Sequence, residues 1–155
     1  MKRSLGLLFA LVTTTETTLL QADDNIRQIA ESRIAEWNAA FAQGKLDDVL
    51  SLYDENAMLL QPNGAVSKNA NEIRAFWQTL IQKGVYAMDI VNVRSDKDDT
   101  IVAMATLADV KTLQNPQRQI MKYNYNGVLY SVFKRQSDGS WKAQVQQWAG
   151  NQGIF

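Results

Sequence analysis

The spacing of the hydrophobic residues changes halfway along this chain of 155 residues. In the first half, apolar residues recur at steps of three and four, as in Ile26, Ala30, Ile34, Trp37 and Phe41. This spacing places them on one face of a helix. From Met88 onward, apolar and polar residues alternate, which is typical of strands with one buried face. Helices followed by strands, rather than a strict alternation of the two, predict an α+β fold with an antiparallel sheet.

Three helices are expected in the first half. The longest covers residues 26–41, with Asp23 or Asp24 as its cap and Gly44 as its stop. The short second helix presents one apolar side, made by Leu46, Val49, Leu50 and Tyr53. The third begins with the capping pair Asn69 and Glu72 and ends at Gly84. Its inward face is expected to carry Ile73, Phe76, Trp77 and Leu80.

One short strand is expected between the helices and four strands after them. The patterns place them at residues 57–60, 88–93, 100–110, 127–135 and 141–148. Turn-forming residues separate them at 61–64, 95–99, 114–117 and 137–140, and the Asp138-Gly139 pair is a strong hairpin signal. A long sheet twists, and a bent one has a concave face that the three helices can cover as a cone.

The first residues resemble a secretory signal. Lys2 and Arg3 precede an apolar run over residues 5–12, and a small residue, Ala22, ends the segment. We therefore expect a signal peptide at residues 1–22, one domain at residues 23–155, and a periplasmic or secreted protein. A helix at the N-terminus is the alternative interpretation.

The composition excludes several kinds of site. The chain has no cysteine and no histidine, which excludes Cys nucleophiles, Ser-His triads and His-based zinc or haem sites. We expect no metal and no cofactor. The 16 basic and 16 acidic residues cancel and are interspersed, so nothing favours binding to nucleic acid, or to a membrane in the mature form.

A gap at the wide mouth of the cone would form a pocket bordered by aromatic groups. The candidates to line it are Trp37, Phe41, Tyr53, Gln61, Trp77, Tyr125, Tyr130 and Trp148. Each aromatic residue can equally be part of the core or of a dimer interface. Gln61 differs, because it is a polar residue between an apolar strand and Pro62. Its amide either binds a ligand or caps the adjacent turn.

Five segments resemble, in order and spacing, the SnoaL-like domains of the superfamily that includes nuclear transport factor two and ketosteroid isomerase. They are residues 37–44, 50–57, 60–63, 73–77, and the C-terminal stretches 132–135, 138–141 and 147–148. The similarity covers residues 26–148, and the most similar branch largely lacks an assigned function. It implies a cone-shaped, cystatin-like α+β fold, a pocket between the first helix and the concave sheet, and frequent homodimerisation through the outer sheet face.

The resemblance does not carry over the isomerase chemistry. In the isomerase relatives a carboxylate base precedes the proline at the strand end, where this chain has Gln61. An amide cannot remove a carbon-bound proton. The oxyanion-hole tyrosine corresponds to Trp37, and its acidic partner falls near Tyr130. All three catalytic positions are therefore changed.

Three functions remain open from the sequence. The leading hypothesis is an exported protein whose pocket binds a small hydrophobic or aromatic molecule. The second is an enzyme of isomerase or hydrolase type that uses acid–base groups in the cone, drawn from Tyr53, Asp54, Asp89, Asp109 and Tyr130. The third is a homodimeric interaction module, because both faces of the strand at residues 128–133 are partly apolar.

Overall fold

The computed structural model describes residues 14–113 and 120–150, and the side chains of residues 22–108 and 127–150. The elements follow in the order α1 (Thr14–Ala42), α2 (Leu46–Ser51), β1 (Tyr53–Leu60), β2 (Val66–Ser67), α3 (Ala70–Lys83), β3 (Tyr86–Lys97), β4 (Thr100–Leu113), β5 (Ile120–Arg135) and β6 (Trp141–Ala149). No helix in this part of the chain is long and apolar enough to cross a membrane.

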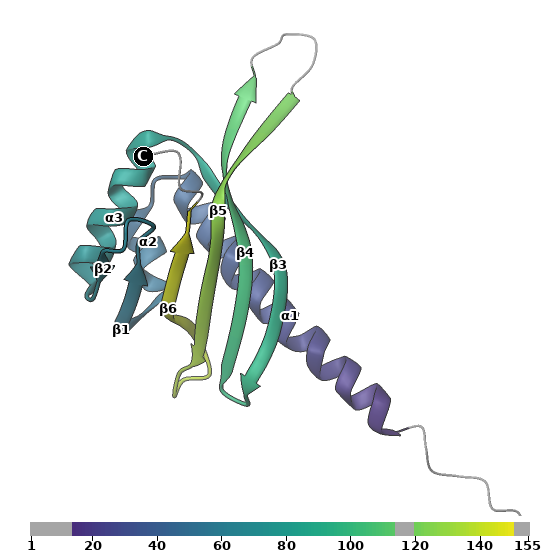
Figure 1. Cartoon of the computed structure of the whole chain (residues 1–155). Helices are drawn as coiled ribbons and strands as arrows, with labels where there is room; N and C mark the ends of the chain where they lie inside the picture. The colour runs from purple at the N-terminus through teal and green to yellow at the C-terminus, as the bar shows by residue number, and fades with distance from the viewer. Residues whose placement is uncertain (1–13, 114–119, 151–155) are drawn as a thin grey trace, which may run out of the picture.

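The strands form one curved, six-stranded sheet in the order β2-β1-β6-β5-β4-β3. All three helices lie on the same side of it, as Figure 1 shows: α1 runs beside β3, while α2 and α3 flank β1. One face of the sheet is therefore covered and the other is not. The predicted α+β cone with three helices is confirmed.

Several element boundaries differ from the expected ones. β1 begins at Tyr53, which was expected on the second helix, and it pairs with β6 in parallel. Strands at opposite ends of the chain are not joined by a hairpin, so nothing forces them to be antiparallel. The two-residue strand β2 was missed, since it is too short for alternation to appear. β3 to β6 are also longer than expected.

The start of α1 also differs from the prediction. The helix already includes Thr14 and passes through Asp23 and Asp24, so neither aspartate is its cap. Residues 1–13 of the expected leader lie outside the described part of the chain, and residues 14–22 belong to α1. Cleavage after Ala22 stays a prediction.

Other local signals are confirmed. Gly44 follows α1 with a φ of 67°, in the left-handed region that suits glycine. The Asn69 side chain accepts a hydrogen bond from the Glu72 N–H at 3.0 Å, and the Glu72 carboxylate accepts one from the Lys68 N–H at 2.7 Å. These contacts satisfy backbone donors at the start of α3 that have no partner within the helix.

Gly127 marks the bend in the sheet. It lies opposite Leu107 at a register shift, with a φ of 131°. A Cβ atom at this position would lie 2.4 Å from the Ala149 carbonyl oxygen and 2.7 Å from Trp148 Nε1. Only glycine leaves room for this approach of β6, so Gly127 sets the position of the Trp148 indole.

Asn38 attaches α1 to the edge of the sheet. Its Nδ2 donates to the Met88 carbonyl oxygen at 2.9 Å, and its Oδ1 accepts from the Met88 N–H at 2.8 Å. Because β3 is the last strand of the sheet, these backbone groups have no neighbouring strand to bond. One side chain therefore replaces a missing strand at this point.

We expect Asn38→Ala to lower the free energy of unfolding by about 1–3 kcal/mol, because it leaves a strand N–H and C=O unpaired beneath α1. Urea denaturation measures this loss. Gln28→Ala, which removes an exposed amide from the same helix, is the matched control and should change stability little. Equal stability of the two variants would contradict the role given to Asn38.

Candidate functional site

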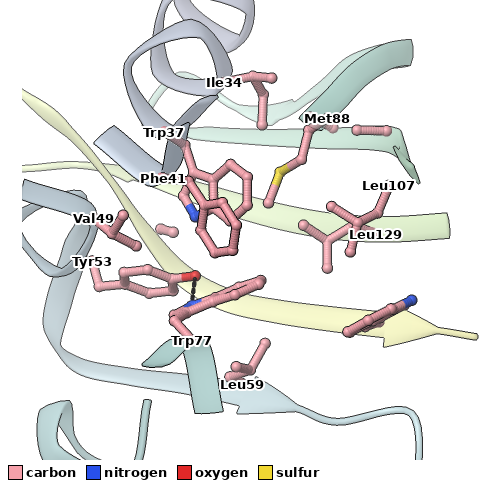
Figure 2. Packing of buried hydrophobic residues seen from close by; sticks show 14 of the residues in the cluster. Ile34, Trp37, Phe41, Val49, Tyr53, Leu59, Trp77, Met88, Leu107 and Leu129 are labelled. Carbon is pink, nitrogen blue, oxygen red and sulfur yellow. Dashed lines mark hydrogen bonds between the residues drawn. The ribbon is translucent and has the colours of Figure 1, made fainter. Parts of the chain in front are cut away.

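Aromatic rings fill the space beneath α1. Trp37 stacks on Phe41 with ring centroids 4.5 Å apart, and its edge meets Trp77 of α3 at 5.0 Å (Figure 2). All three side chains are buried. The space left between Trp37, Tyr53 and Gln146 has a volume of about 10 Å³, at the lower limit for holding one water molecule. The expected hollow between α1 and the sheet is therefore closed.

A chain of buried hydrogen bonds crosses this core. Trp77 Nε1 donates to the Tyr53 hydroxyl at 2.8 Å, the hydroxyl donates to Gln146 Oε1, and Gln146 Nε2 donates to Ser131 Oγ at 2.9 Å. The chain links α3 to β1, β6 and β5. Polar groups without water need such partners, so the network constrains how these four elements pack.

Burial raises the pKa of Tyr53 well above its ordinary value, and the hydrogen bond from Trp77 offsets this only in part. The Trp37 indole nitrogen is directed toward the same hydroxyl (Figure 2) and also lowers the pKa. Its geometry stops short of a hydrogen bond, so Trp37 Nε1 has no partner among the residues the structure describes. Tyr53 stays protonated and serves as a structural donor and acceptor.

The larger opening lies on the other side of α3, where a cleft of about 410 Å³ separates the helix from the β1–β2 turn. One face of α3 lines it, at positions three and four residues apart. The lining consists of Gln61, Pro62, Asn63, Phe76, Thr79, Leu80, Lys83 and Trp148. A volume of this size is typical of a site for a small molecule.

Two aromatic rings border this cleft. Phe76 is half-buried, and its ring meets Trp148 edge to face at 5.9 Å and Trp77 at 4.8 Å. Trp148 is buried, with 3% of its surface exposed. The cleft thus has an apolar floor that joins the core directly, and a polar rim made by the turn amides and Lys83.

The structure divides the predicted pocket residues into groups. Gln61 and Trp148 line the cleft, and Gln61 lies at the end of β1 as expected. Trp37, Phe41, Tyr53 and Trp77 belong to the packed core. Tyr125 lies outside the part of the chain whose side chains are described.

Tyr130 lies on the opposite face of the sheet. Its neighbours Leu129 and Ser131 are buried under the helices, while Tyr130 is 42% exposed. The tyrosine therefore does not border the space within the cone, and it does not take the place of the isomerase acid. Alternation along a strand reveals two faces but not which one the helices cover.

Sequence reasoning missed the α3 side of the cleft. Phe76 was expected in the core, and Thr79 and Lys83 were not singled out. Their spacing from Phe76, by three and seven residues, places all three on one helical face and could have identified them.

No carboxylate is buried among residues 22–108 and 127–150. Asp54 is half-buried, Asp89 is exposed, and the Asp109 side chain lies outside the described residues. The Lys134 ammonium lowers the pKa of Asp99, and hydrogen bonds from Ser140 lower that of Asp138. A general acid needs the opposite shift. In this part of the chain no cluster of three or more His, Cys, Asp or Glu side chains could hold a metal.

Known proteins share this architecture. The pattern of the SnoaL-like domain family matches residues 34–142. The fold is similar to that of a ketosteroid isomerase-like protein from Erwinia carotovora atroseptica, with 14% identity, a TM-score of 0.62, and coverage of 77% of this chain and 92% of that one.

An NTF2-like protein with a cystatin-like fold from Novosphingobium aromaticivorans is 17% identical, with a TM-score of 0.62 and coverage of 92% of both chains. A protein of unknown function with a cystatin-like fold from Nostoc punctiforme is 13% identical, with a TM-score of 0.63, covering 83% of this chain and 92% of that one. A search of the curated proteins finds no match to the sequence. Identities this low show a shared fold alone.

We expect Tyr53→Phe to lower the free energy of unfolding at neutral pH by about 1–3 kcal/mol, since it leaves the Trp77 N–H and the Gln146 oxygen without the hydroxyl. Chemical denaturation at pH 7 measures the difference. Tyr130→Phe, which removes an exposed hydroxyl from the other sheet face, should be nearly neutral. A loss as small as that of Tyr130→Phe would contradict the structural role of the network.

The raised pKa of Tyr53 also predicts a pH dependence. Above pH 10.0, the ordinary tyrosine value, the unfolded chain releases this proton while the folded chain retains it. The stability of the wild type therefore falls with rising pH, by up to about 1.4 kcal/mol per unit from this group. Tyr53→Phe lacks that contribution, so the gap between the two proteins should narrow as pH rises above 10. A constant gap from pH 8 to pH 11 would be inconsistent with a buried, protonated Tyr53.

Proposed function

Because the chain belongs to the SnoaL-like domain family and a cleft of about 410 Å³ lies beside α3, we propose that the cleft binds a small, largely apolar molecule. The observation that carries this proposal is the composition of the cleft wall. Phe76, Leu80 and Trp148 supply apolar surface, and the Gln61 and Asn63 amides stand at its edge. Apolar walls with a few polar groups are typical of ligand sites.

Binding is better supported than acid–base catalysis in this cleft. Within the part of the chain whose side chains are described, no aspartate, glutamate or tyrosine lines it. Tyr53 is buried in the hydrogen-bonded core, and burial raises its pKa, so it holds its proton. Proton transfer to a ligand needs a titrating group within hydrogen-bond reach. We further propose, from the N-terminal sequence pattern, that the protein is exported.

We also propose that the protein forms a homodimer through the outer face of the sheet. The strand register places Met58, Val145, Val132 and Val102 side by side in one row across this face. Tyr130 and Met104 lie side by side in the next row. Met58 is 40% exposed and Tyr130 is 42% exposed, and the rest are half-buried. A continuous apolar surface of this kind favours contact with another protein surface.

The cleft proposal predicts that aromatic fragments raise the melting temperature, since a ligand that binds only the folded state stabilises it. Thr79→Trp places an indole at the cleft rim and should abolish the shift. Ser32→Trp, which adds the same indole to the groove between α1 and the β5–β6 turn, should leave it intact. A shift that survives Thr79→Trp, or a fragment set with no shift at all, would contradict binding in the cleft.

The dimer proposal predicts that Val132→Glu converts a dimer to a monomer, because it places a charge in the apolar row. Light scattering and sedimentation measure the change in mass. Val85→Glu is the control, since Val85 is 47% exposed but lies before β3, outside that row. A wild-type protein that is monomeric at high concentration would overturn this proposal.

A further inference from the structure

The polar atoms at the cleft rim divide into those already engaged and those left free. Gln61 Nε2 donates to Ser67 Oγ at 3.0 Å, and Asn63 Oδ1 accepts from the Ala65 N–H at 3.0 Å. Thr79 Oγ1 donates to the Ala75 carbonyl oxygen at 2.9 Å. These bonds leave three side-chain groups available to a ligand: the oxygen Oε1 of Gln61, the Nδ2 hydrogens of Asn63 and the ammonium of Lys83.

The charge among the described residues of the cleft wall is positive. Among the described residues that line it, Lys83 is the only charged one. Its ammonium forms no ion pair with the residues the structure describes, as is also true of Lys97, and what distinguishes Lys83 is its place in the cleft wall. A cation in the same cleft as two aromatic rings, with no carboxylate among the described lining residues, favours an anionic ligand over a neutral or cationic one.

From these contacts we propose that the cleft selects planar aromatic anions. The carboxylate pairs with Lys83 and accepts from the Asn63 amide, while the ring packs against Phe76 and the Trp148 side of the floor. This inference rests on the proposed binding function and adds the charge of the ligand to it. The orientation follows from the geometry, because the apolar floor adjoins the core and the free donors stand at the rim.

A purely structural role for Lys83 predicts a different result. The residue lies in the last turn of α3, where a cation interacts favourably with the helix dipole even without a ligand. The same end of the helix repels an anion. Removing the Lys83 charge should therefore weaken anion binding selectively, whereas a lysine that serves only the helix would alter stability and leave ligand preference unchanged.

The test compares three matched probes, 2-naphthoate, 2-naphthamide and 2-naphthylmethylammonium, by calorimetric titration of the full chain at pH 7 and low salt. We expect the naphthoate to bind about tenfold more tightly than the naphthamide, and the ammonium probe to bind most weakly, which corresponds to one charge-assisted contact. In Lys83→Met the naphthoate should lose its advantage and fall to or below the naphthamide. Lys97→Met removes an exposed lysine at the end of β3 and should leave the order unchanged.

The outcomes separate the two proposals. If the naphthamide binds as tightly as the naphthoate, and Thr79→Trp blocks both, the cleft binds small molecules but the charge inference is overturned. If the naphthoate advantage persists in Lys83→Met, the anion is held elsewhere and the inference also fails. If none of the three probes binds, the proposed function fails for this ligand class together with the inference.

Discussion

The packing of Trp37 and Phe41 against Trp77 fills the space beneath α1 and so limits where a cavity can lie in this fold. The three rings meet at centroid distances of 4.5–6.1 Å and join α1 to α3 above the sheet. Such large side chains bury much apolar surface and leave no room beneath α1. Because the centre of the cone is closed, the openings lie at its periphery, and one of them separates α3 from the β1–β2 turn. The candidate site is therefore a consequence of core packing.

The same packing explains the polar groups of the core. The chain from Trp77 through Tyr53 and Gln146 to Ser131 lies beneath α1, where the sequence led us to expect a pocket. Here its atoms bond one another, and the space beside them is only about 10 Å³. Burial raises the free-energy cost of ionising the Tyr53 hydroxyl, so this group does not act as a base. Of the three positions that correspond to catalytic groups in the isomerase, only Trp37 lies in this core, whereas Gln61 lines the cleft and Tyr130 lies on the outer face of the sheet.

The sequence predicted the class of fold and the number of helices, because the two hydrophobic periodicities are long and clear. It could not predict that β1 and β6 are parallel, since pairing between distant segments leaves no local signal. It also identified Gln61 and Trp148 but assigned Trp37 and Tyr53 to the pocket. Whether an aromatic residue fills a hollow or borders one depends on the sum of side-chain volumes from several elements, which a linear pattern does not contain. Tyr130 shows a related limit, because alternation does not say which face is covered.

The two sides of α3 have different surroundings, because one is buried in the core and the other lines the cleft. Its inward side carries Trp77 and Ile73, which are almost fully buried, so substitutions there create cavities that cost several kcal/mol. Its cleft side carries Thr79 and Lys83, which are exposed and can change at little cost. Phe76 and Leu80 connect the two sides. A helix divided in this way lets residues on the cleft side change while the buried side keeps the cone intact.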